Sequence, residues 1–360
     1  MSRLFVFRHL VIAWLIVGLG GCAHLIYPVT ERSTQVFHIE TSDGWSIAIH
    51  HFAPKGSKKQ STPVLLCHGI SSNKYNWDLN DEYSFPSYIA AKGFDTYVVE
   101  LRGSGQSTQP GIFDDKSYDY SFDDYVLKDL PAAIDFVSSR SETGQVHWMG
   151  HSMGSMVMYA YLQRVGQEKI RSVTAVGSPP KLFEGNESLG RGISLFPMVD
   201  LIYDELPSGL LVKTIAPLAY PGVIAPQHVL WNYDNLDPEV ARQTGAHAVD
   251  NLSSKVISQL VAGRKQGYLA SADGRYNYTD GMKKIEVPIF FVVGNLDQMA
   301  PPSVMVEAFR KVSSKEKRIE ILSRANGYAH DYGHVDLVLG KTAPTEVFPL
   351  LEQWLAQHEG

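Results

Sequence analysis

A serine stands between two glycines in the segment VHWMGHSMGSMVMY, residues 146–159. The apolar residues 146–149 predict a buried strand, and residues 155–165 predict a helix. A chain that turns sharply from a strand into a helix needs small residues on both sides of the turn, because bulky neighbours would clash with the strained central residue. The pattern indicates that the Ser152 hydroxyl stands above the carboxyl end of a strand as a nucleophile. The backbone N–H of Met153 would then point at a developing oxyanion.

The order of the other elements predicts an α/β fold. Strands are expected at residues 35–40, 45–52, 64–67, 95–101, 170–176, 287–293 and 318–322, and helices at residues 85–92, 123–139 and 347–357. Strands that alternate with helices in this way predict a mostly parallel central sheet with helices on both faces. Pro131 is expected to kink the second of these helices.

One long stretch, residues 179–284, breaks the alternation. It is rich in Leu, Phe, Tyr and Pro, with short helical candidates at residues 237–244 and 251–262. We interpret it as a helical cap or lid inserted over one edge of the sheet. Its apolar side chains favour an apolar acyl group in the substrate, and ordinary packing of a cap explains them equally well.

A nucleophilic serine needs a base, and the base needs an orienting acid. Asp297 follows the strand expected at residues 287–293 and therefore lies at the carboxyl edge of the sheet, where sites gather in open α/β sheets. Two prolines soon after it suggest a fixed loop. Two histidines compete for the role of base in the last loop. We favour His334, which follows a glycine and precedes an apolar helical start, over His330.

The second donor of an oxyanion hole is expected at the end of the strand at residues 64–67. The sequence His-Gly-Ile-Ser follows this strand, and the backbone N–H of Ile70 is the candidate donor. The sequence RGSG at residues 102–105 ends the next strand but lacks the spacing of a phosphate-binding loop, which predicts a structural turn.

The N-terminus reads as an export signal. Two arginines precede the apolar residues 10–17, which form a stretch too short to span a bilayer comfortably, and small residues follow. The sequence LGGC at residues 19–22 resembles the lipobox of bacterial lipoproteins, which implies cleavage after residues 1–21 and a lipid on Cys22. This resemblance predicts a lipid-anchored protein of the bacterial cell envelope, and Ala23 after the cysteine favours the outer membrane.

The chain resembles the α/β-hydrolase superfamily from about residue 36 to its C-terminus, except for the insertion. The matching motifs are HGIS at 68–71, RGSG at 102–105, GHSMG at 150–154, GNLD at 294–297 and GHVD at 333–336. The resemblance implies one α/β-hydrolase domain, residues 22–360, with a cap at about 179–284. The serine at the elbow excludes the branches that use an aspartate nucleophile. The last motif is also similar to the H-x-D ending of acid-lipase-like members.

These residues predict a serine esterase or lipase that works through an acyl-enzyme, with ester or lipid substrates and attachment to the membrane through the N-terminal lipid. An acyltransferase would use the same triad, and a lipid-anchored binding protein could use the same scaffold without chemistry. No cofactor or metal is expected, because the two cysteines form no ligand cluster, and Cys67 reads as a buried strand residue. A net charge of −6 argues against a nucleic-acid partner. The oligomeric state is left open.

Overall fold

The computed structural model describes residues 26–56, 59–111, 114–181, 204–216 and 227–359. The predicted signal peptide and Cys22 lie outside these residues, as do many of the apolar positions of the predicted lid. Within the described residues, no helix is both long enough and apolar enough to cross a membrane.

Eight strands of the described chain form one sheet. They are β1 (Gln35–Glu40), β2 (Ser46–Phe52), β3 (Val64–Cys67), β4 (Thr96–Glu100), β5 (Val146–His151), β6 (Ile170–Val176), β9 (Ile289–Gly294) and β10 (Lys317–Leu322). Their order is β1-β2-β4-β3-β5-β6-β9-β10, with antiparallel pairing at β1–β2 and β2–β4 and parallel pairing everywhere else. The predicted mostly parallel sheet is confirmed, and the carboxyl ends of β3, β5, β6 and β9 meet at one edge.

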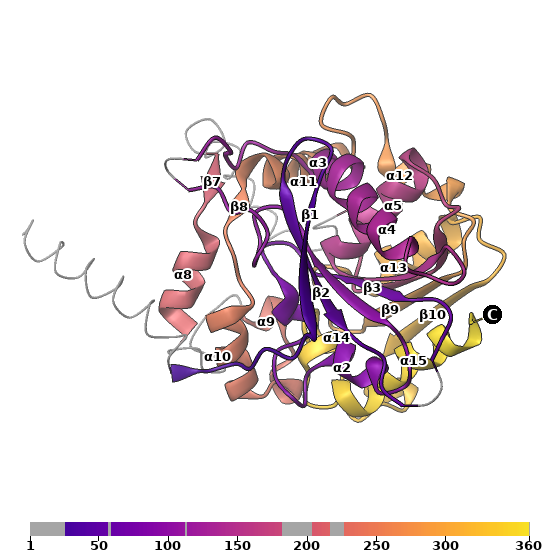
Figure 1. The fold of residues 1–360 in the computed structure, drawn as a ribbon. Helices are drawn as coiled ribbons and strands as arrows, with labels where there is room; N and C mark the ends of the chain where they lie inside the picture. Colours follow the sequence, from indigo (N-terminus) through magenta and orange to yellow (C-terminus); the bar gives the residue numbers. More distant parts are fainter. Residues whose placement is uncertain (1–25, 57–58, 112–113, 182–203, 217–226, 360) are drawn as a thin grey trace, which may run out of the picture.

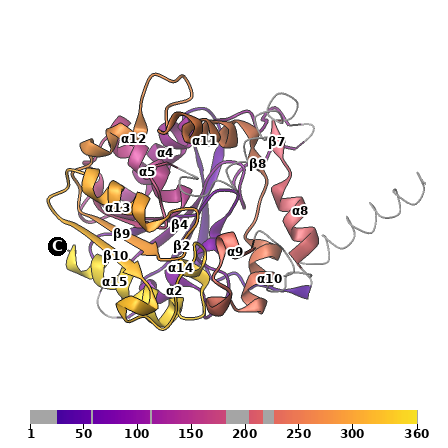
Figure 2. The same cartoon turned by 180° about the vertical axis from the view of Figure 1, so that it is seen from behind.

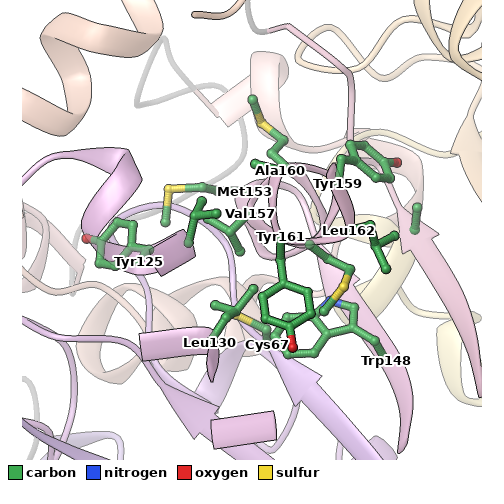
Figure 3. Packing of buried hydrophobic residues seen from close by; sticks show 14 of the residues in the cluster. Cys67, Tyr125, Leu130, Trp148, Met153, Val157, Tyr159, Ala160, Tyr161 and Leu162 are labelled. Atoms are coloured by element: carbon green, nitrogen blue, oxygen red, sulfur yellow. The ribbon is translucent and has the colours of Figure 1, made fainter. Parts of the chain in front are cut away.

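Helices cover both faces of the sheet (Figures 1 and 2). One face carries α4 (Leu130–Ser138), α5 (Met153–Arg164) and α13 (Pro302–Lys311), and the other carries α2 (Phe85–Ala90), α14 (Asp336–Leu339) and α15 (Phe348–Gln357). Each face buries its own apolar core, as a doubly covered sheet requires. Figure 3 shows part of the first core, where side chains of α5 meet Cys67, Leu130 and Trp148.

Two prolines act differently from the expectation. The single helix predicted at residues 123–139 is divided into α3 (Phe122–Asp124), a π-helical turn at Tyr125–Asp129 and α4, with Pro131 in the first turn of α4. The wider turn precedes the proline, which has no N–H for a regular helical bond. The expectation of a loop at Pro302 is wrong, because Pro302 begins α13. Proline suits the first turn of a helix, where its missing N–H costs no hydrogen bond.

The described part of the insertion has two portions. The first contains β7 (Glu205–Leu206), α8 (Ser208–Ile215), α9 (Gln227–Leu230), α10 (Pro238–His247) and β8 (Leu252–Ser253), and the second contains α11 (Ser254–Gln266) and α12 (Tyr278–Gly281). Helix α10 packs against α8, and β7 pairs with β8. Helices α11 and α12 pack instead on α3 and α5, over the body of the domain. The first portion, which we call the cap, lies at the carboxyl edge of the sheet beside β3.

The first described residues, 26–34, form an N-terminal strap along the cap and the turn after β3. The strap begins against α10, where the carbonyl of Tyr27 contacts His247 Nε2. Glu31 then pairs with the buried Lys74 at 2.7 Å, and Arg32 pairs with the buried Asp78 at 2.6 Å. Because Lys74 and Asp78 are buried, these ion pairs supply the partners that buried charges require.

Another buried cluster of charged side chains stabilises the turn after β4. Arg102 is 1% exposed and donates through its guanidinium to Asp129 at 2.7 Å and to Asp43 at 2.8 Å. Burial raises the pKa of Asp129 to about 6 even beside this arginine. The predicted structural turn at residues 102–105 is thus held by a buried carboxylate whose counter-charge is Arg102, and the backbone N–H of Arg102 also donates to Asp129 at 2.9 Å.

Candidate active site

The backbone of the elbow after β5 is strained at Ser152, and the glycines on both sides leave room for this conformation. Ser152 has φ 53° and ψ −122°, precedes the first residue of α5 and is 2% exposed. Its N–H donates to the carbonyl of Val176 at 2.9 Å, which fixes the elbow against β6. A Cβ on Gly150 would lie 2.3 Å from the backbone of Gly154, and one on Gly154 would lie 2.5 Å from the carbonyl of Cys67. Both glycines are therefore required by close backbone contact rather than by flexibility.

The loops after β9 and β10 bring an acid and an imidazole together. His334 Nδ1 lies 2.8 Å from Asp297 Oδ2, and both side chains are buried. The other oxygen of Asp297 accepts the N–H groups of Met299 and Ala300, each at 2.8 Å. The carboxylate is thus fixed before it orients the ring, and it can stabilise the positive charge that the ring gains as a base.

The pair lies next to the strands that carry the serine. A Cβ built on Gly177, directly after β6, would be 3.1 Å from Asp297 Oδ2 and 3.2 Å from His334 Nδ1. Within the described chain, the Ser152 hydroxyl makes no hydrogen bond, either to His334 or to another group. His330, the competing base, makes no described contact with Asp297, and its Nδ1 is buried without a partner among the described residues. The geometry therefore favours His334 as the histidine of this site.

His151 links the elbow to the histidine loop. The sequence pattern favours a ring packed locally, but His151 Nε2 lies 3.2 Å from the carbonyl of His334, and the two rings are 4.8 Å apart. Burial, together with the nearby His334, holds the pKa of His151 well below its ordinary value. His151 Nδ1 also lies 3.1 Å from Asn76 Oδ1, so the ring joins the loop after β3 to the backbone of His334, beside the residue that precedes Ser152.

The two backbone N–H groups predicted to bind an oxyanion lie in the turns directly after β3 and β5. The oxyanion loop, residues 68–73, passes close to the elbow, since a Cβ on Gly69 would be 3.3 Å from Ser152 Cβ. Asn76 Oδ1 accepts the Gly69 N–H at 3.0 Å and fixes this approach. The N–H groups of Ile70 and Met153, the two predicted oxyanion donors, donate to no acceptor in the described part of the chain.

A further carboxylate, which the sequence did not mark as a site residue, supports the histidine loop. Asp336 Oδ2 accepts the N–H of Gly333 at 2.9 Å and that of Asn232, from the cap, at 2.8 Å. Its Oδ1 is buried with no partner among the described residues. Burial raises the pKa of Asp336 to about 7. The H-x-D spacing was the only signal of this residue in the sequence.

Cys67 takes no part in the site. The thiol is fully buried in β3, and burial raises its pKa. Among the described residues, no group of three His, Cys, Asp or Glu side chains is arranged to hold a metal ion.

Comparison with known proteins agrees with this architecture. A family described as "alpha/beta hydrolase fold" matches residues 62–325. The chain is similar to triacylglycerol lipase 1 of Arabidopsis thaliana, with 24% identity over 92% of this chain and 89% of the relative. It is 27% identical to human lysosomal acid lipase/cholesteryl ester hydrolase over 44% of this chain and 45% of that protein. Among solved structures, a monoglyceride lipase from Saccharomyces cerevisiae superposes with a TM-score of 0.67 at 16% identity, covering 93% of this chain and 99% of that one.

Proposed function

We propose, since this chain belongs to the α/β-hydrolase fold family, that it cleaves apolar carboxylic esters with Ser152 as nucleophile, His334 as base and Asp297 as the orienting acid. It is a carboxylic ester hydrolase of the lipase and esterase type, like its relatives. The assignment of roles to individual residues and the choice of lipid-like substrates are our proposal. The buried His334–Asp297 pair beside the strained serine is the observation that carries it.

The proposed reaction has two halves. His334 Nε2 takes the proton of Ser152 as Oγ attacks the ester carbonyl carbon, and the carbonyl oxygen becomes an oxyanion held by the N–H groups of Ile70 and Met153. The alcohol leaves with the proton from His334, and an acyl-serine remains. Water then gives its proton to His334 as it attacks this acyl group, and the acid leaves when Ser152 recovers the proton.

Two observations support an apolar substrate. The similar proteins include triacylglycerol, monoglyceride and cholesteryl ester lipases. The cap places Leu230 and the buried Trp231 directly against the histidine loop, where the carbonyl of Leu230 accepts the Val335 N–H at 2.8 Å. The substrate would therefore enter between the cap and the carboxyl edge of the sheet, past apolar side chains.

We further propose that Cys22 carries a lipid and holds the enzyme in the bacterial cell envelope, with the outer membrane as the favoured location. The support is the sequence LGGC at residues 19–22. Metabolic labelling with an alkyne fatty acid would mark the wild-type protein and leave the Cys22→Ser variant unmarked. Equal labelling of both proteins would overturn lipidation at this residue.

A fluorophosphonate probe and a series of p-nitrophenyl esters test the enzymatic proposal. The wild-type protein should be labelled at Ser152 and should hydrolyse longer acyl chains faster than acetate. Ser152→Ala and His334→Ala should each lower kcat by about a million-fold if the residues act as a unit. His330→Ala is the matched control and should retain activity. Loss of activity in His330→Ala with retention in His334→Ala would reverse the assignment of the base. Faster release of the p-nitrophenol with an added alcohol acceptor would favour acyl transfer.

A further inference from the structure

A single carboxylate of the cap reaches three other parts of the site. Asp250 precedes β8 and is 5% exposed. Its Oδ2 accepts the Gly105 N–H at 2.7 Å and the Asn73 side-chain amide at 2.9 Å, and its Oδ1 pairs with Lys213 Nζ at 3.0 Å. Gly105 belongs to the turn after β4, Asn73 to the oxyanion loop and Lys213 to α8, so one side chain joins all three.

The backbone of Asp250 holds the same loop by a second route. Its N–H donates to the carbonyl of Ser71 at 3.0 Å, and its own carbonyl accepts the hydroxyl of Ser71. Ser208, at the start of α8, also donates to that carbonyl, at 2.9 Å, and its oxygen lies 2.7 Å from the Ser71 hydroxyl. Ser71 is therefore tied to the cap through both its backbone and its side chain.

Ser71 is a residue that needs such ties. Its φ of 53° lies in the left-handed region, which a serine occupies only when its surroundings impose it. Ser71 directly follows Ile70, whose N–H is the proposed second oxyanion donor. A donor of this kind is effective only when it lies about 2.7–3.1 Å from the oxyanion. A relaxed Ser71 would turn the preceding peptide and move this N–H away from its place.

We propose that Asp250 is a positioning residue for the oxyanion loop, and that it makes the oxyanion hole dependent on the position of α8 in the cap. The inference rests on the proposed function, because it assumes that the Ile70 N–H binds the oxyanion. Displacement of α8 removes Ser208 and Lys213 from Asp250 together, and Ser71 is then held only by its two bonds to the backbone of Asp250, whose carboxylate has lost its cation. Binding of a substrate under the cap and completion of the hole become one event.

Asp250→Asn is the direct test. The carboxylate accepts three bonds through two oxygens, whereas an amide has one oxygen and an NH₂ group, so at least one of the three donors would face another donor. With p-nitrophenyl acetate, kcat should fall about 10- to 100-fold, less than the loss of an entire oxyanion donor, while KM stays within about two-fold. Affinity for a boronic acid that mimics the tetrahedral intermediate should fall by the same factor as kcat/KM.

Two further variants separate positioning from general stability. Lys213→Met removes only the ion pair between α8 and the Asp250 carboxylate, leaves the Ser208 bonds in place, and should lower kcat about three- to ten-fold, with the inhibitor affinity following it. Asp237→Ala removes the N-cap of α10, where Asp237 accepts the N–H groups of Glu239 and Val240, and it touches no part of the oxyanion loop. Asp237→Ala should lower the melting temperature and leave kcat and inhibitor affinity unchanged.

Each result either supports or overturns the positioning role of Asp250. A folded Asp250→Asn with unchanged kcat and inhibitor affinity overturns the inference, as does an equal loss of kcat in Asp237→Ala. If Asp250→Asn fails to fold, Lys213→Met alone decides by the same readouts. Failure of the proposed function looks different, because the wild-type protein itself would then resist the fluorophosphonate probe at Ser152.

Discussion

The buried Asp336 makes a quantitative prediction about folding stability and pH. The folded protein holds this carboxyl with a pKa of about 7, because it is fully buried, whereas an unfolded chain has a value of about 3.9. A carboxyl with a raised pKa binds its proton more tightly in the folded state. The stability that it contributes is therefore present at low pH and is lost as the pH rises from about 4 through about 7. A difference of about three pKa units corresponds to roughly 4 kcal/mol.

Asp336→Asn isolates this effect. The amide does not ionise, and its oxygen can still accept the N–H groups of Gly333 and Asn232. Its NH₂ group would occupy the place of Oδ1, which has no partner in the described chain, at a cost of about 1–3 kcal/mol that does not vary with pH. We therefore expect the variant to be less stable than wild type at pH 4.5 and more stable at pH 8, with the difference in unfolding free energy changing by roughly 3–4 kcal/mol.

Urea unfolding followed by tryptophan fluorescence at pH 4.5, 6 and 8 measures this difference directly. The matched control is Asp234→Asn, a cap carboxylate whose side chain is 74% exposed, which should leave the pH dependence of wild type unchanged. Other buried carboxyls, such as Asp129, contribute equally to wild type and variant and cancel. Parallel stability curves for wild type and Asp336→Asn would refute the reasoning that burial keeps this group protonated.

Three further substitutions have clear expected outcomes. Arg102→Met leaves Asp129 buried without its counter-charge and should lower the unfolding free energy by about 3–5 kcal/mol, seen as a lower midpoint of chemical unfolding; an unchanged midpoint would contradict it. Gly154→Ala places a Cβ 2.5 Å from a backbone carbonyl of β3 and should abolish soluble, probe-reactive protein, so a fully active variant would disprove the close contact. Asp297→Asn should keep the fold and lower kcat about ten-thousand-fold by removing the acceptor that orients His334, and a loss confined to KM would count against this role.

Much of the sheet could be predicted from the sequence, because strands that are buried on both faces leave unbroken apolar runs. β1, β3 and β6 begin and end at the predicted residues, and the other strands do so within about two residues. The glycines around Ser152 marked the elbow because close backbone contacts permit nothing larger. Pro302 was misread, because a proline before a helix and a proline in a fixed loop look alike until the apolar face of α13 is seen to pack on β9 and β10.

The supporting contacts of the site could not be predicted. Asn76, Asp250 and Asp336 act through side-chain hydrogen bonds to other segments, and such bonds follow no sequence period. The sequence favoured His334 over His330 because it follows a glycine and precedes an apolar helical start, and in the fold it is the His334 ring that meets Asp297. The catalytic roles themselves stay a prediction for the labelling and kinetic experiments.

The N-terminal strap limits how far the enzyme could stand from a membrane. Cys22 precedes Glu31 by nine residues, and Glu31 is fastened to the buried Lys74, just after the oxyanion loop. Nine residues reach at most about 30 Å when fully extended. A lipid on Cys22 would thus tether the molecule to the membrane through a short segment on its cap side. If Cys22 carries the proposed lipid, the cap side of the molecule would stay closer to the bilayer than the opposite edge of the sheet.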